Sequence, residues 1–310
     1  MIFKKIILLL STITLLLTGC KTNASMQHEQ TDTSKNTEAF KTEETSSDET
    51  QQADTEALSQ PEILHFVDAL GGWHETEILP TVAKHNYNWE YLSNDGQNIS
   101  YIGDTNYTIR KGIDVSYHQK TIDWEKVKAD GYDFAFLRVG YRGYAESGKL
   151  MQDSAFATNI KNAQKAGIDV GVYFFAQAIN EQEAMEEAEF VLNILKDYTL
   201  QLPVVYDPEL IRDAKARTDD VTGEQFTKNT IIFCEAMKQA GFEPMIYSNM
   251  VWEATLFDME QLQVYPFWYA DYEKVPQTPY NFTFWQYSES GSVDGINGNT
   301  DLNVWFCPTN

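Results

Sequence analysis

Short apolar runs alternate with amphipathic stretches from about residue 111 to the end of the chain. The apolar runs are rich in Val, Ile, Phe and Tyr, as buried strands are. They occupy residues 112–115, 133–140, 168–176, 202–206, 244–248, 266–271 and 283–287, with shorter runs around Val293 and at 302–305. The stretches between them place apolar residues three and four positions apart, as helices do. These predicted helices occupy residues 123–130, 153–166, 180–196, 222–239 and 250–256.

Strands that alternate with helices over this length predict an α/β protein with a parallel sheet. About eight strands in roughly 200 residues favour a closed barrel, and the helices are too few for a complete outer layer. The sequence therefore predicts a flattened (β/α) barrel with a reduced helical layer over residues 111–310. An open, doubly wound sheet is the alternative, but the first strand is not followed by a Gly-rich phosphate loop.

The residues before the barrel have a different character. Residues 61–110 read as an N-terminal extension, in which 89–93 and 98–102 flank Asn-Asp-Gly-Gln and predict a β-hairpin. Residues 20–60 are mostly Ser, Thr, Gln and acids, with nine acids against three Lys in 21–60. Such a composition cannot bury enough apolar surface to fold, so we expect a disordered, solvated tether. Residues 1–19 read as a signal peptide, with a basic start and a short apolar run.

Composition narrows the functional classes. The chain has 310 residues, 46 Asp plus Glu against 23 Lys plus Arg, and a formal charge of −23. No basic surface is available for phosphate, so we predict no nucleic-acid partner. Of the three cysteines, Cys20 lies at the expected cleavage site, and Cys234 and Cys307 can either pair or remain free thiols.

Four acids lie where predicted strands end, which is where barrels carry their active sites. They are Asp114, Asp207, Glu209 and Asp301. Asp207 and Glu209 are two positions apart, so on an extended chain both side chains point to the same face. Two carboxyls so close push their pKa values apart, which can leave one protonated near neutral pH. A protonated acid beside an ionised one is what cleavage of a glycosidic bond requires.

Other readings of these residues stay open. Acids after a strand also cap helices, and acid-Pro pairs are common in turns. The oxygen ligands of the four acids would suit a divalent cation, although no ligand-rich loop accompanies them, so we predict no metal and no cofactor. Ser116 and His118 have neither a third partner nor a nucleophile elbow to make them a hydrolase triad.

Aromatic residues gather at the same predicted strand ends. They are Tyr141, Tyr173, Tyr247, Trp268, Tyr269, Trp285 and Tyr287. Alternate strand residues face the core, so some of them are structural. An exposed subset, in which we place Tyr141, would stack on the apolar faces of sugar rings.

Eight segments, in order from about residue 111 to 306, resemble glycoside hydrolase family 25, the muramidases that cleave peptidoglycan. They are GIDVSYHQ (112–119), DFAFLRVGYRG (133–143), GVYFFA (171–176), PVVYDPE (203–209), YSN (247–249), FWYADY (267–272), FWQYS (284–288) and TDLNVW (300–305). The resemblance implies a flattened barrel with few helices. Pro208 and Lys120 depart from the family pattern, in which a larger residue and a Gly are usual.

The resemblance also implies roles for individual residues. Glu209 would protonate the leaving sugar oxygen, and Asp207 would orient the N-acetyl group of muramic acid as it attacks its own anomeric carbon. Asp114 and Asp301 would bind substrate and set the pKa of Glu209. Three more residues match positions that line the sugar groove: Tyr173, Trp268 and Gln286. A glycan-binding protein that does not cleave, or a glycosidase that acts on chitin-like polymers, are the competing hypotheses.

Leu17-Thr18-Gly19-Cys20 resembles a bacterial lipobox, which implies a lipid on Cys20. We therefore expect a monomer held on the outer face of the cell membrane through this lipid, with peptidoglycan strands as its partner.

Overall fold

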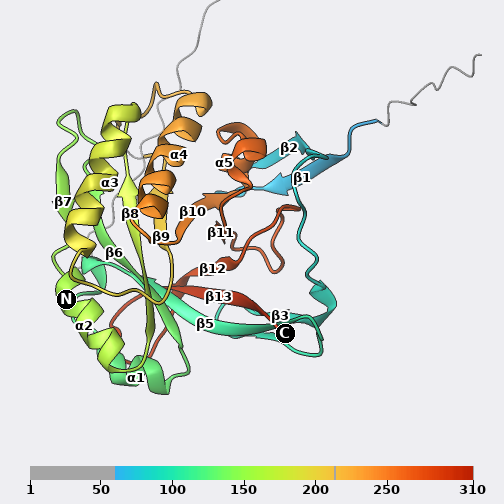
Figure 1. Ribbon diagram of the computed structural model, residues 1–310. Helices are drawn as coiled ribbons and strands as arrows, with labels where there is room; N and C mark the ends of the chain where they lie inside the picture. The colour runs from blue at the N-terminus through green and yellow to red at the C-terminus, as the bar shows by residue number, and fades with distance from the viewer. Residues whose placement is uncertain (1–59, 213, 310) are drawn as a thin grey trace, which may run out of the picture. The chain divides into compact units, whose positions relative to one another are not determined.

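Eight strands close into a barrel in the computed structural model, which describes residues 60–212 and 214–309 (Figure 1). Their order around the ring is β5, β13, β12, β11, β10, β9, β8 and β6, and β6 pairs with β5 to close it. The bounds are Tyr107–Val115 for β5, Phe134–Arg142 for β6, Asp169–Ala176 for β8, Val204–Pro208 for β9, Pro244–Asn249 for β10, Phe267–Ala270 for β11, Phe284–Gly291 for β12 and Thr300–Pro308 for β13. The predicted closed barrel is confirmed, and the open sheet is wrong.

Seven of the barrel strands run parallel, and β13 runs antiparallel to both β12 and β5. A parallel pair needs a long crossover, whereas only eight residues separate β12 from β13. The strand predicted around Val293 is wrong, because this run lies in that connection. Gly295 and Gly298 turn the chain there with φ of 97° and 99°, values that glycine adopts readily. A short strand, β7 (Leu150–Gln152), pairs with β6 outside the ring.

Helices cover only part of the barrel, as predicted. They are α1 (Trp124–Ala129), α2 (Phe156–Lys165), α3 (Glu181–Leu195), α4 (Gly223–Gln239), α5 (Met250–Thr255) and α6 (Met259–Leu262). The three long ones, α2, α3 and α4, pack against β6, β8, β9 and β10 (Figure 1). The side chains of Asn180 and Thr222 cap the starts of α3 and α4, because they accept hydrogen bonds from amides in the first turns of these helices.

The N-terminal extension covers the outer face of β12, β13 and β5, where helices are missing. Tyr87 stacks on Phe306 of β13 at 4.2 Å between ring centroids, and its hydroxyl donates to the carbonyl of Phe282. The extension contains two hairpins: β1 (Ile63–Val67) pairs with β2 (Trp73–Glu77), and β3 (Leu92–Asn94) pairs with β4 (Ile99–Tyr101). The second is the predicted hairpin, although its first strand begins later because Trp89–Tyr91 form a 3-10 turn.

Side chains alternate between the two faces of each strand, which produces two separate apolar clusters. The cluster inside the barrel includes Phe134, Phe136, Val205, Trp268 and Phe284. The larger cluster lies between the strands and the helices or extension. Inside, glycines make room for rings, because a Cβ on Gly112 would lie 2.3 Å from the Phe134 ring. The apolar interior fills the barrel below the carboxyl ends of the parallel strands.

Lys120, which replaces the usual family Gly, has φ 58° and ψ −119° directly after the Tyr117–Gln119 turn. Glycine adopts this region without strain, whereas a residue with a Cβ is strained there, which accounts for the glycine in the family pattern. Cys234 is buried in α4 and Cys307 lies in β13, and each is a free thiol.

The signal peptide, Cys20 and the tether lie outside the described residues. Within residues 60–212 and 214–309, none of the helices combines the length and apolar character that a membrane crossing requires.

Candidate active site

A cavity of about 330 Å³ opens at the carboxyl ends of the parallel strands. It brings together seven of the predicted site residues, namely Asp114, Tyr173, Asp207, Glu209, Trp268, Gln286 and Asp301. Tyr247, Tyr272 and Glu289 complete its lining. Tyr141 is outside this lining: its ring lies under the Arg138 guanidinium at 5.2 Å, and its hydroxyl contacts Met151. Its predicted contact with substrate stays a prediction.

Strand alternation places Asp207 and Glu209 on one face. Along β9, Val205 belongs to the interior cluster and Tyr206 to the outer one, so Asp207 and then Glu209 point inward again. Pro208 ends the strand between them, where it is buried beside Ala176 of β8. The proline therefore leaves both acids directed into the same cavity. Asp207 is 3% exposed, and Glu209 is partly exposed, so Glu209 is the more accessible of the two.

The Asp207 and Glu209 carboxyls are hydrogen-bonded to each other. Burial raises the pKa of both, and the negative charge of Glu209 raises the pKa of Asp207 further. Oδ1 of Asp207 is buried without a hydrogen-bond partner among the described residues, so no hydrogen bond at this oxygen offsets the cost of ionising it. For Glu209, burial is partly opposed by the hydrogen bond from Asp207 and by the charge of Arg138. In this geometry the pair favours a shared proton, and the pKa of Asp207 is raised well above its usual value.

Asp114 and Asp301 form a second hydrogen-bonded pair, on neighbouring strands β5 and β13 where they are direct partners in register. Burial raises the pKa of Asp114, but hydrogen bonds from Asn303 and Gln286 oppose the rise. Burial and then the negative charge of Asp114 raise the pKa of Asp301 to about 9. At neutral pH the proton of this pair therefore resides on Asp301, and Asp114 is the anion. Its charge in turn raises the pKa of Glu209.

Two side-chain amides are oriented so that they stabilise the Asp114 anion. Both Nε2 of Gln286 and Nδ2 of Asn303 donate to Oδ2 of Asp114 at 2.8 Å. Their oxygens face other donors, because Trp268 Nε1 donates to Asn303 Oδ1 at 2.8 Å, and Tyr247 and Tyr272 donate to Gln286 Oε1 at 2.8 and 3.0 Å. A flipped amide would lose these bonds, so the aromatic hydroxyls and the indole fix the direction of both amides.

The charge of Arg138 lowers the pKa of both Asp207 and Glu209. Nε of Arg138 donates to Asp153 at 2.9 Å, and its guanidinium lies 5.0 Å from the centroid of the Tyr117 ring. Its Nη2 is buried without a hydrogen-bond partner among residues 60–212 and 214–309.

Gln177 fixes the main chain of Glu209. Its Nε2 donates to the Glu209 carbonyl at 2.6 Å, and its Oε1 accepts from Thr218 at 3.0 Å. The backbone of Gln177 is held as well, since its amide donates to Glu187 and its carbonyl accepts from Arg217. Gln177 is 1% exposed. Glu209 lies just beyond the last residue of β9, so this amide supplies the positioning that the sheet no longer gives.

Sequence reasoning missed Arg138, Gln177, Tyr272 and Asn303. Asn303 could have been found, because it lies two positions after Asp301 on the same strand and thus on the same face. Gln177 gives no sequence signal, since it acts through a main-chain contact with a residue 32 positions away. No group of three or more potential metal ligands is arranged to hold an ion in the part of the chain that the structure describes.

The aromatic residues divide between the cavity and the core. Tyr173, Tyr247 and Trp268 face the interior, with the Tyr247 and Trp268 rings packed edge to face at 4.9 Å. Tyr269, Trp285 and Tyr287 are buried in the outer cluster, so they are structural. The site thus combines two proton-sharing carboxyl pairs with aromatic walls, a combination suited to acid–base chemistry on a sugar ring.

The chain is similar in sequence and in fold to known proteins. The model of the family described as glycosyl hydrolases family 25 matches residues 113–296. Lysozyme M1 of Streptomyces globisporus is 29% identical over 211 residues, which cover 65% of this chain and 69% of that protein.

Two solved structures are also similar. The bacterial lysozyme of Streptomyces coelicolor aligns with a TM-score of 0.52 and 27% identity, covering 63% of this chain and 90% of that one. The modular autolysin LytC of Streptococcus pneumoniae, solved in complex with a synthetic peptidoglycan ligand, aligns with a TM-score of 0.57 and 26% identity over 78% of this chain. The alignment spans only 56% of the autolysin.

Proposed function

The chain belongs to glycosyl hydrolase family 25, and on this premise we propose that it hydrolyses the β-1,4 bond between N-acetylmuramic acid and N-acetylglucosamine in peptidoglycan. The observation that carries the proposal is the cavity in which four carboxyls form two hydrogen-bonded pairs beside aromatic walls. The lysozyme and autolysin names of the relatives support the same substrate.

The proposed reaction is substrate-assisted and retains the anomeric configuration. The carbonyl oxygen of the muramic acid N-acetyl group attacks the anomeric carbon, the bond to the leaving oxygen breaks, and Glu209 gives that oxygen its proton. Asp207 orients the N-acetyl group and stabilises the positive oxazolinium ion that forms. Water then adds to the anomeric carbon while Glu209 takes one of its protons, and the N-acetyl group is restored.

Glu209 must carry the shared proton when cleavage begins, whereas the pKa of Asp207 is raised as well. An N–H donor from the N-acetyl group at Asp207 would stabilise its ionised form and move the proton across the hydrogen bond to Glu209. The anionic Asp114 keeps the pKa of Glu209 raised and so supports this transfer. In this proposal, correct placement of the N-acetyl group causes the general acid, Glu209, to become protonated.

The test is mass spectrometry of peptidoglycan digested by residues 60–310. We expect fragments with reducing N-acetylmuramic acid ends. Reducing N-acetylglucosamine ends would contradict the proposed bond, and the absence of any new reducing ends would favour the alternative, a glycan-binding protein that does not cleave. Release of fragments from chitin but not from cell wall would identify a different glycosidase.

We also propose that the protein is anchored in the cell membrane by a lipid on Cys20, with the acidic tether of residues 21–60 between the lipid and the barrel. The lipobox-like sequence before Cys20 supports this placement. We expect the intact chain to enter the detergent phase on extraction, and Cys20→Ala to remain in the aqueous phase. An unmodified Cys20 in protein taken from membranes would contradict it.

A further inference from the structure

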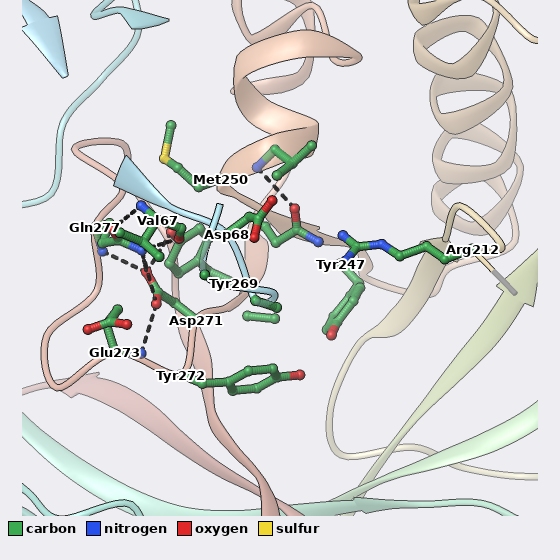
Figure 2. Close-up of a pocket in the computed structure, with 15 residues that line it drawn as sticks. Val67, Asp68, Arg212, Tyr247, Met250, Tyr269, Asp271, Tyr272, Glu273 and Gln277 are labelled. Atoms are coloured by element: carbon green, nitrogen blue, oxygen red, sulfur yellow. Dashed lines mark hydrogen bonds between the residues drawn. The ribbon is translucent and has the colours of Figure 1, made fainter. Parts of the chain in front are cut away.

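A second cavity, of about 200 Å³, lies beside the catalytic cavity and against the turn of the β1–β2 hairpin (Figure 2). Tyr247 and Tyr272 line both cavities. Because both hydroxyls donate to Oε1 of Gln286, the two rings are fixed as the wall between the cavities. Arg212, from the loop after β9, reaches toward this wall (Figure 2).

The hairpin turn is held firmly on the barrel rim. The side chain of Gln277 accepts from the amide of Val67 at 2.8 Å and donates to its carbonyl at 2.9 Å. The amide of Gln277 donates to Asp271 at 2.9 Å, and Phe66 is 1% exposed. The cavity is therefore preformed. The turn lies outside residues 113–296, so it is an addition to the part of the chain that the family model matches.

Two of the three carboxylates that line this cavity are already occupied. Asp68 and Asp271 are held by bonds within the protein, to Leu70, Gly72 and His74 for the first and to Tyr269 and Gln277 for the second. The carboxylate of the third, Glu273, is exposed and has no hydrogen-bond partner among the described residues. Arg212 is exposed and makes no ion pair or hydrogen bond with any described residue.

Asn249 also has an unused donor. Its Oδ1 accepts from the amides of Val251 and Trp252 at the start of α5, whereas its Nδ2 has no acceptor within the described ranges. A guanidinium and an amide donor facing one cavity match a carboxylate.

We propose that this cavity binds the peptide attached to N-acetylmuramic acid, with a carboxylate of that peptide paired with Arg212. The inference rests on the proposed function. The N-acetyl group and the lactyl group that bears the peptide are on adjacent carbons of the sugar, so a sugar whose N-acetyl group contacts Asp207 directs its peptide out beside the catalytic pair. Arg212 is close enough to this pair for its charge to lower the pKa of Glu209. The cavity would thus make the enzyme selective for strands whose peptides carry free carboxylates.

The test compares soluble, uncross-linked strands whose peptide carboxylates are free with the same strands after chemical amidation. For the intact protein we expect kcat/KM to be about fivefold higher on the free-acid strands, through a lower KM, since one exposed charge pair contributes about that factor. In Arg212→Gln the ratio should fall to about one. Lys215→Gln removes the same charge from the same loop away from the cavity, so it should keep the intact ratio.

An equal loss on both substrates in Arg212→Gln, or an unchanged ratio, would overturn the proposal. Calorimetry with an N-lactoyl peptide separates it from the proposed function. If the protein cleaves neither strand, the proposed function fails, and tighter binding of the free-acid peptide than of the amidated one, lost in Arg212→Gln, would still support the site. Equal binding of the two peptides would overturn it.

Discussion

Replacing Glu209 by Gln should lower kcat on peptidoglycan about a thousandfold or more while the barrel stays folded. Gln keeps the size of the side chain and can still accept from its neighbours, but it has no proton to give to the leaving oxygen and cannot take one from water. General acid–base groups contribute roughly 10²- to 10⁴-fold, and Glu209 would act in both steps of the reaction. The measurement is the initial rate of appearance of reducing ends.

Stability distinguishes a chemical loss from a structural one in this variant. Burial raises the pKa of Glu209, so the folded protein bears a cost for any charge on it, and Gln removes that cost. The unfolding temperature of Glu209→Gln should therefore equal or exceed that of the intact protein. Glu243→Gln makes the same change at an exposed acid before β10 and should leave the rate unchanged. Full activity in Glu209→Gln would remove the basis for the proposed mechanism.

The barrel could be predicted because its signals are local. Runs such as 168–176 and 244–248 coincide with β8 and β10 within about one residue, and the helices predicted at 180–196 and 222–239 coincide with α3 and α4 to the same precision. The strand predicted around Val293 is wrong because apolar content alone does not form a strand, and two glycines in this segment have positive φ. The first hairpin gave no signal, since Trp73–Glu77 is mostly exposed and has no apolar pattern, and the hairpin is held through bonds between Val67 of β1 and Gln277.

The candidate site could be predicted only where side chains alternate regularly between the two faces of a strand. Alternation puts Asp207 and Glu209 on one face, and chain position puts Asp114 and Asp301 at strand ends, so the cluster of acids follows from the sequence. The sequence does not show which acid of each pair holds the proton, because that depends on hydrogen bonds from residues far along the chain. Asn303, 189 positions after Asp114, is one of the two amides that keep Asp114 ionised.

A buried ion network behind β9 connects stability to the site. Arg142 donates to Glu187 at 2.9 Å and to the carbonyls of Gly148 and Glu183 at 3.0 and 2.9 Å. Glu187 is fully buried, and it also accepts from the hydroxyl of Tyr206. Glu187 accepts from the backbone amide of Gln177 too, and the side chain of that residue holds Glu209.

Arg142→Met should therefore lower the free energy of unfolding by about 3–5 kcal/mol at pH 8, because it leaves Glu187 buried without its cation. Burial raises the pKa of Glu187 to about 7 even with Arg142 present, so folded Glu187 holds a proton between about pH 4.5 and 7 that the unfolded chain has released. By linkage, its contribution to stability falls as pH rises through that range. Without Arg142 the folded pKa rises further, and the loss continues above pH 7. The destabilisation measured by urea unfolding should thus be larger at pH 8 than at pH 5.

The double variant Arg142→Met with Glu187→Gln tests whether the uncompensated carboxylate is the cause. Gln removes the buried charge, so the double variant should be more stable at pH 8 than Arg142→Met alone, and its stability should depend less on pH. A destabilisation that is equal at both pH values, or a double variant that is less stable still, would show that Arg142 acts through packing and its carbonyl contacts instead. Gln177 holds the main chain of Glu209, so Arg142→Met should also lower kcat. Glutamine at position 187 keeps an oxygen for the amide of Gln177, so the double variant should regain part of that kcat.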